Sequence, residues 1–283
     1  MKPSLPHNNS SLIWSAYSLP EGNRPADWQV HNIGDCHIHV GCERSGDQAS
    51  LFLLTRHDEL PRLLPPDCPP PSREPPRSAD DRRWQRCAIG KLTEYQLLPV
   101  YPTLPLCIRL DRAVSLPPGG ILQGWLFSSA SAEIRVGDVP LTTVAPRALH
   151  KTLYGNTTDG VVCHDLSSPL LDKATADDPL SGDPPAGPPD SVAHPIRIRN
   201  SSGETVVIQE LCVYGSQLSI FRKQQQLFSE IIQFTFGPTR IKMGVEPLSR
   251  RDHTILTLAE AKIGGEEKVL ERSLEVLKAL TRM

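Results

Sequence analysis

The sequence predicts an all-β protein, made of antiparallel β-sandwich-like modules with a C-terminal amphipathic α-helix. Short apolar segments recur between residues 106 and 236, and Gly, Pro, Asn and Asp separate them. In the first segment Leu106, Ile108 and Leu110 alternate with less apolar residues, which is the period of a strand with one buried face. A strong helical pattern occurs only after residue 262. Short strands without intervening helices are typical of antiparallel sheets.

Two proline-rich segments, residues 60–76 and 177–190, divide the chain of 283 residues. Proline lacks the backbone donor that a central strand or a helix interior needs, so we expect loops or linkers there. The expected divisions are an N-terminal β segment (1–60), a Pro-rich and charged linker (61–90), a central β module (91–175), a Pro-rich acidic loop (176–191), a second β module (192–262) and a C-terminal helix (263–283).

Each β module contains several expected strands. In the central module they are residues 106–114, 121–127, 132–136, 139–144 and 160–165. In the second module they are residues 194–200, 204–215, 217–221 and 227–236. Val206, Ile208 and Leu211 break the two-residue period, which predicts a β-bulge or a strand buried on both faces.

The C-terminal segment 263–283 has the pattern of an amphipathic helix. Its apolar stripe consists of Val269, Leu270, Leu274, Leu277 and Leu280. This stripe either covers a sheet of the same molecule or binds a partner protein. The Pro-rich loop at 60–76 has the same two interpretations, a surface spacer or a polyproline II segment that docks on a partner.

Composition excludes some function classes. The net charge is −2 and the pI is about 6.5, which disfavours nucleic-acid binding. No run of 18 apolar residues predicts a membrane span, and the first 14 residues lack the apolar core of a secretory signal. The seven cysteines form no C-x-x-C pair, which argues against a disulfide framework or a zinc ribbon. We therefore expect a cytoplasmic protein.

One short motif indicates metal chemistry. Asp35, His37 and His39 lie at two-residue spacing in a strand-like segment, so their side chains share one face. Two imidazoles placed in this way can ligate a divalent metal such as zinc, with the carboxylate as a third ligand or as an orienting group. The motif resembles the first-strand motif of the amidohydrolase superfamily, although the chain lacks the strand–helix alternation of a (β/α)₈ barrel. The other interpretation is that Cys36, Ile38 and Val40 face the core and the three polar residues face water.

Two further features have structural interpretations. Cys163, His164 and Asp165 contain the residue types of a catalytic triad, but neighbours on a strand point to opposite faces. We therefore expect a buried Cys163 beside exposed His164 and Asp165. Gly264 and Gly265 precede the last helix and are more typical of a flexible helix entrance than of an anion site.

Three segments resemble a known family. They are residues 97–120, with a Pro-rich strand, residues 153–170, with a YG…G…C turn followed by SP, and residues 196–221, with an RIRN strand ahead of a β run. In this order they resemble an uncharacterised prokaryotic family, known mainly from archaea and described only as a domain of unknown function. The resemblance implies a β-rich protein with no established activity and no catalytic residues to carry over.

These observations favour a non-catalytic binding or scaffold role, with no cofactor. The alternative is a metal-dependent hydrolase that uses Asp35, His37 and His39 as metal ligands. That alternative requires further ligands to fold beside them. The candidates are His150, His164, His194 and Asp165.

Overall fold

The computed structural model describes residues 13–21, 27–57, 84–146, 149–154, 161–172, 184–247 and 254–262. The regular elements within these ranges are strands, apart from one short 3-10 helix, η2 (Gly215–Gln217). The chain divides into a first unit, residues 1–98 with 132–144, and a second unit, residues 99–131 with 145–283. No helix in the described ranges is long and apolar enough to cross a membrane. The all-β prediction is confirmed.

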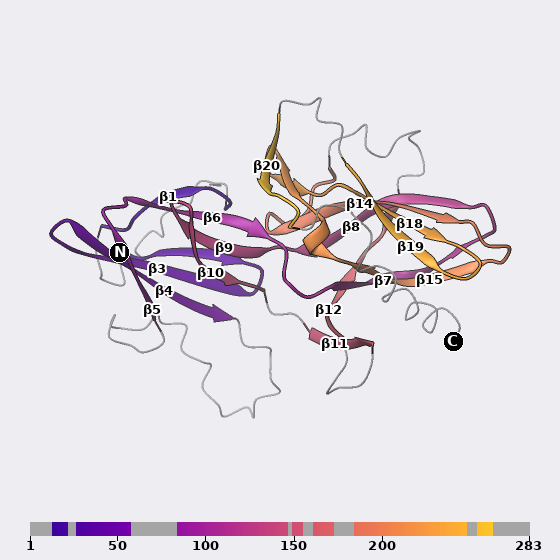
Figure 1. Ribbon diagram of the computed structural model, residues 1–283, viewed down its shortest axis with the longest axis horizontal. Helices are drawn as coiled ribbons and strands as arrows, with labels where there is room; N and C mark the ends of the chain where they lie inside the picture. The colour runs from indigo at the N-terminus through magenta and orange to yellow at the C-terminus, as the bar shows by residue number, and fades with distance from the viewer. Residues whose placement is uncertain are drawn as a thin grey trace, which may run out of the picture. The chain divides into compact units, whose positions relative to one another are not determined.

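The first unit contains two four-stranded sheets (Figure 1). One is an antiparallel meander of β2 (Gln29–Ile33), β3 (Cys36–Ser45), β4 (Gln48–His57) and β5 (Gln85–Gly90). The other has the order β1-β6-β9-β10, from β1 (Ala16–Ser18), β6 (Glu94–Val100), β9 (Ser131–Val136) and β10 (Val139–Val144). Gly34 and Gly46, in the turns on either side of β3, have φ of 56° and 61°, which favours glycine.

Strand β3 shows why the first unit folds as it does. Cys36, Ile38, Val40 and Cys42 follow the two-residue period and are at most 1% exposed, so they form a core row. Across the unit, His31 Nε2 of β2 lies 2.6 Å from the hydroxyl of Tyr95 on β6, which joins the two sheets.

The opposite face of β3 differs from the prediction of a wet face. It carries a second apolar cluster of Phe52, Leu54 and Trp84, against which Trp28 packs. The Trp28 and Trp84 ring centroids are 4.6 Å apart. A Cβ on Gly41 would lie 2.9 Å from the Trp28 ring, which is too close. Only glycine at this position therefore lets the ring pack against β3.

The second unit also contains two sheets. The smaller has the order β11-β12-β7-β15, from β7 (Leu106–Leu116), β11 (Leu149–Tyr154), β12 (Val161–Ser168) and β15 (Val206–Val213). The larger contains β8 (Ile121–Ser129), β13 (Leu171–Asp172), β14 (Ser191–Asn200), β16 (Ile220–Lys223), β17 (Gln226–Phe228), β18 (Ile231–Phe236), β19 (Ile241–Glu246) and β20 (Ile255–Ala259).

Most predicted strands of the second unit are confirmed, and so is the bulge. The expected strand 217–221 begins only at Ile220, in β16, and the expected strand 227–236 is divided between β17 and β18. The pairing of β15 with β7 shifts register between Ile208 and Glu210. The expectation of purely antiparallel sheets is wrong, because β12 pairs with β7 in parallel and β14 pairs with both β17 and β18 in parallel. Parallel neighbours need a crossover connection, which short turn signals do not reveal.

Several expectations remain open. The C-terminal helix at 263–283, Gly264 with Gly265, and the Pro-rich loop at 60–76 lie outside the described residues. The sandwich arrangement and the domain boundaries stay predictions. Strand β5 lies inside the segment 61–90 that we expected to be linker, and it pairs with β4.

Candidate functional site

The motif at Asp35, His37 and His39 lies at the start of β3 in the first unit. Asp35 occupies the turn before the strand, and its carboxylate is 4.0 Å from His57 Nδ1. His37 is half-buried, with its Nδ1 2.8 Å from Asn32 Oδ1. His39 is 9% exposed, and its buried Nδ1 has no hydrogen-bond partner among the residues that the structure describes. The core-facing part of the structural interpretation is confirmed, but His39 is buried because apolar side chains share its face.

The further ligands that a metal-dependent hydrolase requires are His150, His164, His194 and Asp165, and all four lie in the second unit. Across the described ranges, no group of three or more His, Cys, Asp or Glu side chains is arranged to hold a metal ion. The assignment of Asp35, His37 and His39 as metal ligands stays a prediction.

Cys163, His164 and Asp165 follow one another on β12 and alternate between its faces. Cys163 is fully buried, as predicted. His164 and Asp165 are half-buried rather than exposed, because each has a neighbour from another strand. His164 contacts the ring of His150, and Asp165 accepts hydrogen bonds from Arg109. The three side chains therefore do not form a nucleophile, base and orienter set.

Asp165 belongs to a charged cluster of Lys151, Asp165, Arg109 and Glu210 on one face of the smaller sheet. The Arg109 Nη2 atom lies 2.9 and 2.7 Å from the two Asp165 oxygens. Lys151 Nζ is 3.5 Å from Asp165 and donates a short hydrogen bond to Glu210. Burial alone would lower the pKa of Lys151, but the Glu210 and Asp165 carboxylates raise it. The cluster is electrically balanced, which suits a structural role.

Three thiols lie on the same face as the charged cluster. Cys107 and Cys212 are directly opposite each other on β7 and β15, and Cys163 lies on the neighbouring strand β12. The hydrogen bond to Cys212, together with burial, raises the pKa of Cys107 well above its usual range. Burial raises the pKa of Cys163 to about 12. Both groups remain neutral thiols at physiological pH, which makes them poor nucleophiles.

His194 on β14 is the centre of a buried hydrogen-bond chain. Its Nε2 lies 2.8 Å from Ser128 Oγ, and its Nδ1 lies 3.0 Å from Ser229 Oγ. Ser229 donates to the Glu230 carbonyl at 2.8 Å, so it must accept a proton from Nδ1. Nε2 then accepts the Ser128 hydroxyl proton. Burial lowers the pKa of His194 to about 3.

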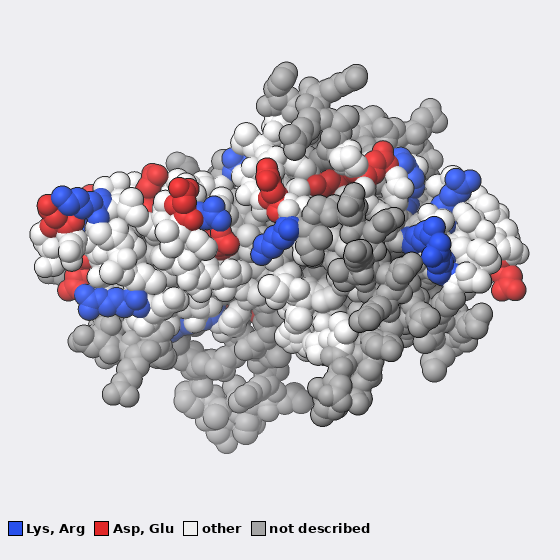
Figure 2. Space-filling view, viewed as in Figure 1, with Lys and Arg blue, Asp and Glu red and all other residues white. Residues whose placement is uncertain are grey.

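The described surface mixes the two signs of charge. On the face that Figure 2 shows, acidic groups lie next to basic groups in several places. Exposed ion pairs of the described residues include Lys91 with Asp47, 3.0 Å apart, and Arg86 with Glu43, 3.7 Å apart. Exposed pairs of this kind contribute little to stability.

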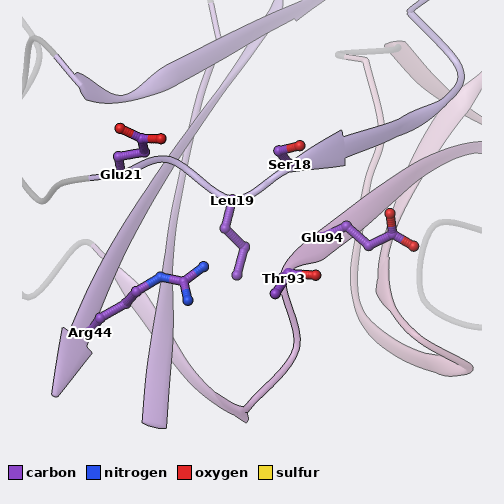
Figure 3. A pocket seen from close by; sticks show the side chains of 6 residues that line it. All are labelled: Ser18, Leu19, Glu21, Arg44, Thr93 and Glu94. Carbon is purple, nitrogen blue, oxygen red and sulfur yellow. The ribbon is translucent and has the colours of Figure 1, made fainter. Parts of the chain in front are cut away.

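A cavity of about 430 Å³ lies in the first unit, between the turn after β1, strand β3 and the start of β6. Its lining residues are Ser18, Leu19, Glu21, Arg44, Thr93 and Glu94 (Figure 3). The hydrogen bond from Leu19 N to Thr93 O, at 2.9 Å, fixes its wall. In Figure 3 the Arg44 side chain extends towards Leu19, and Glu94 points away from it. We call this cavity the Arg44 pocket.

The charges of the Arg44 pocket are not paired with one another. Among the described residues, no carboxylate makes an ion pair with Arg44, Glu21 and Glu94 included. The pocket therefore offers a ligand the Arg44 guanidinium, and Glu21 and Glu94 are the acidic residues of its lining. Its size lies within the range of small-molecule sites.

Sequence motifs predict neither the Arg44 pocket nor the three neighbouring thiols of the smaller sheet. Arg44 carries no motif, and its pocket is formed by three segments separated in the sequence. Cys107 and Cys212 are more than 100 residues apart, and only the pairing of β7 with β15 brings them together. The available signal for a buried network was Ser128, which directly follows the apolar residues 125–127.

Comparison with known proteins identifies a family but no activity. No significant match to a curated protein or to a solved structure is found. The family model described as a protein of unknown function (DUF432) matches residues 13–276, which is nearly the whole chain. The resemblance to a domain-of-unknown-function family is thus confirmed. The chain belongs to the DUF432 family.

Proposed function

We propose that the protein has a non-catalytic binding role and that the Arg44 pocket holds a small zwitterionic ligand. The observation that carries this proposal is the guanidinium of Arg44, which makes no ion pair with a described carboxylate, in an open pocket that Glu21 and Glu94 also line. A ligand carboxylate would pair with Arg44, and a ligand ammonium group would pair with one of the two carboxylates.

The protonation states of the described residues support binding over catalysis. Burial raises the pKa of Cys36 to about 12, as it does for Cys163. Burial lowers the pKa of His31 to about 4 and that of His194 to about 3. A catalytic nucleophile or base needs a pKa near the working pH, which these groups do not have. The six described cysteines are free thiols, which also supports our expectation of a reducing cytoplasm.

The test is a binding screen with free amino acids as probes. Glycine, glutamate and lysine are titrated into the protein by isothermal calorimetry, with acetate and methylamine as single-charge controls. We expect saturable binding of at least one zwitterion that weakens about tenfold or more in Arg44→Met. Glu21→Gln should weaken binding less, because Glu94 remains.

Lys91→Ala is the matched control, since its ion pair with Asp47 lies on the exposed surface. Binding should be unchanged in this variant. Equal binding by wild type and Arg44→Met, or no binding of any zwitterion, would contradict the proposed ligand site.

A second candidate function is a metal-dependent hydrolase that uses Asp35, His37 and His39. The observation that favours it is the buried, unpartnered Nδ1 of His39. Burial, followed by the charges of Arg56 and His37, lowers the pKa of His39, which keeps it neutral as a metal ligand must be. Metal analysis of the purified protein, compared with His37→Ala, tests this. No bound metal in the wild type would end this candidate.

A further inference from the structure

His150 and His164 form a cross-strand pair in the second unit. They are directly opposite each other on the antiparallel strands β11 and β12. Their ring centroids are 4.8 Å apart, with 43° between the ring planes. Paired residues on neighbouring strands point to the same face, so both imidazoles are presented together.

Both rings are suited to ligate a cation. The Nδ1 atom of His164 is buried and has no hydrogen-bond partner in the described part of the chain. His150 is exposed on β11, which is the edge strand of its sheet, so an ion can approach from solvent.

We propose that His150 and His164 together bind one divalent transition-metal ion, such as Zn²⁺ or Ni²⁺. Two imidazoles that share a tetrahedral Zn²⁺ at about 2.0–2.1 Å have ring centroids roughly 5 Å apart. The observed separation of 4.8 Å is close to this value. Because no third His, Cys, Asp or Glu among the described residues joins them, water completes the coordination.

Neighbouring charges do not compete for the ion. Lys151 and Asp165 are adjacent in sequence to the two histidines but lie on the other face of the sheet. There they are engaged with Glu210 and Arg109 in the charged cluster. The pair is therefore a two-imidazole site, of a kind that exchanges its metal readily.

The test is metal titration of the full chain at neutral pH, with Zn²⁺ or Ni²⁺ alone as the probe. Calorimetry should show binding that weakens about tenfold or more in His150→Asn and in His164→Asn, whereas Leu149→Asn, at an exposed neighbour of His150 on β11, should retain it. His150 is exposed, so its variant tests the site even where His164→Asn fails to fold.

The outcomes decide the proposal. Loss of binding in His150→Asn, with retention in Leu149→Asn, supports it. Unchanged affinity in His150→Asn overturns it, as does equal loss in Leu149→Asn. No binding by the wild type also overturns it. None of these results depends on the Arg44 pocket.

Discussion

His194 and His164 both lie in the second unit, yet their ring nitrogens differ in what surrounds them. Both nitrogens of His194 have serine hydroxyls at 2.8 and 3.0 Å. The Nδ1 atom of His164 is also buried, but it has no hydrogen-bond partner within the described ranges, and another imidazole lies beside it.

The difference separates structural from ligand-binding residues. A buried polar group whose hydrogen bonds are all made stabilises the fold and has no free donor or acceptor for a ligand. A buried polar group without a protein partner can bond a water or a ligand instead. By this criterion His194 is structural, whereas His164 is open to a ligand.

The largest effect should follow from removing His194. His194→Ala leaves a core cavity and two buried serine hydroxyls without their partner, and we expect it to lower the free energy of unfolding by about 3–5 kcal/mol. Urea denaturation measures this. A loss below about 1 kcal/mol would mean that the Ser128–His194–Ser229 chain is not a structural element.

A smaller loss should come from the charged cluster. Lys151→Met leaves Glu210 half-buried and unpaired, which should cost about 1–3 kcal/mol in urea denaturation. The control is Lys91→Met, whose exposed ion pair should contribute less than about 0.5 kcal/mol. Equal losses in the two variants would show that burial does not strengthen the cluster.

The pH dependence of the unfolding free energy should test the protonation state of His194 independently of its packing. Its pKa of about 3 in the folded state lies below the unfolded value of about 6.5, so only the unfolded state takes up a proton between these pH values. Stability is therefore lost as pH falls from about 6.5 towards 3, by about 1.4 kcal/mol per pH unit for this group. His194→Asn should reduce the slope of unfolding free energy against pH by that amount. An unchanged slope would contradict a neutral, buried His194.

The smallest effect should be at His150. Because its side chain is exposed, His150→Asn should change the free energy of unfolding by no more than about 0.5 kcal/mol without metal. In excess Zn²⁺ the wild type should gain stability and the variant should not. A large loss of unfolding free energy without metal would show that the histidine pair stabilises the fold by packing instead of binding a metal.

Much of the fold was predictable from the sequence, but little of the candidate sites was. Alternation identified the row from Cys36 to Cys42 and the strands around Leu106, because side-chain period is a local property. It did not identify parallel pairing of β12 with β7, which depends on a long crossover. Likewise, the pocket around Arg44 and the residues that contact His150 and His194 depend on which strands become neighbours. Only short-range consequences, such as the opposite faces of Cys163 and His164, could be derived in advance.

The most direct test of the central claim is nitrogen-15 NMR of the histidine rings during a Zn²⁺ titration. We expect the ring nitrogens of His150 and His164 to shift together to a saturating end point while those of His194 stay unchanged. A shift at His194, or none at His150 and His164, would contradict the claim that unpartnered nitrogens mark the ligand positions of this protein.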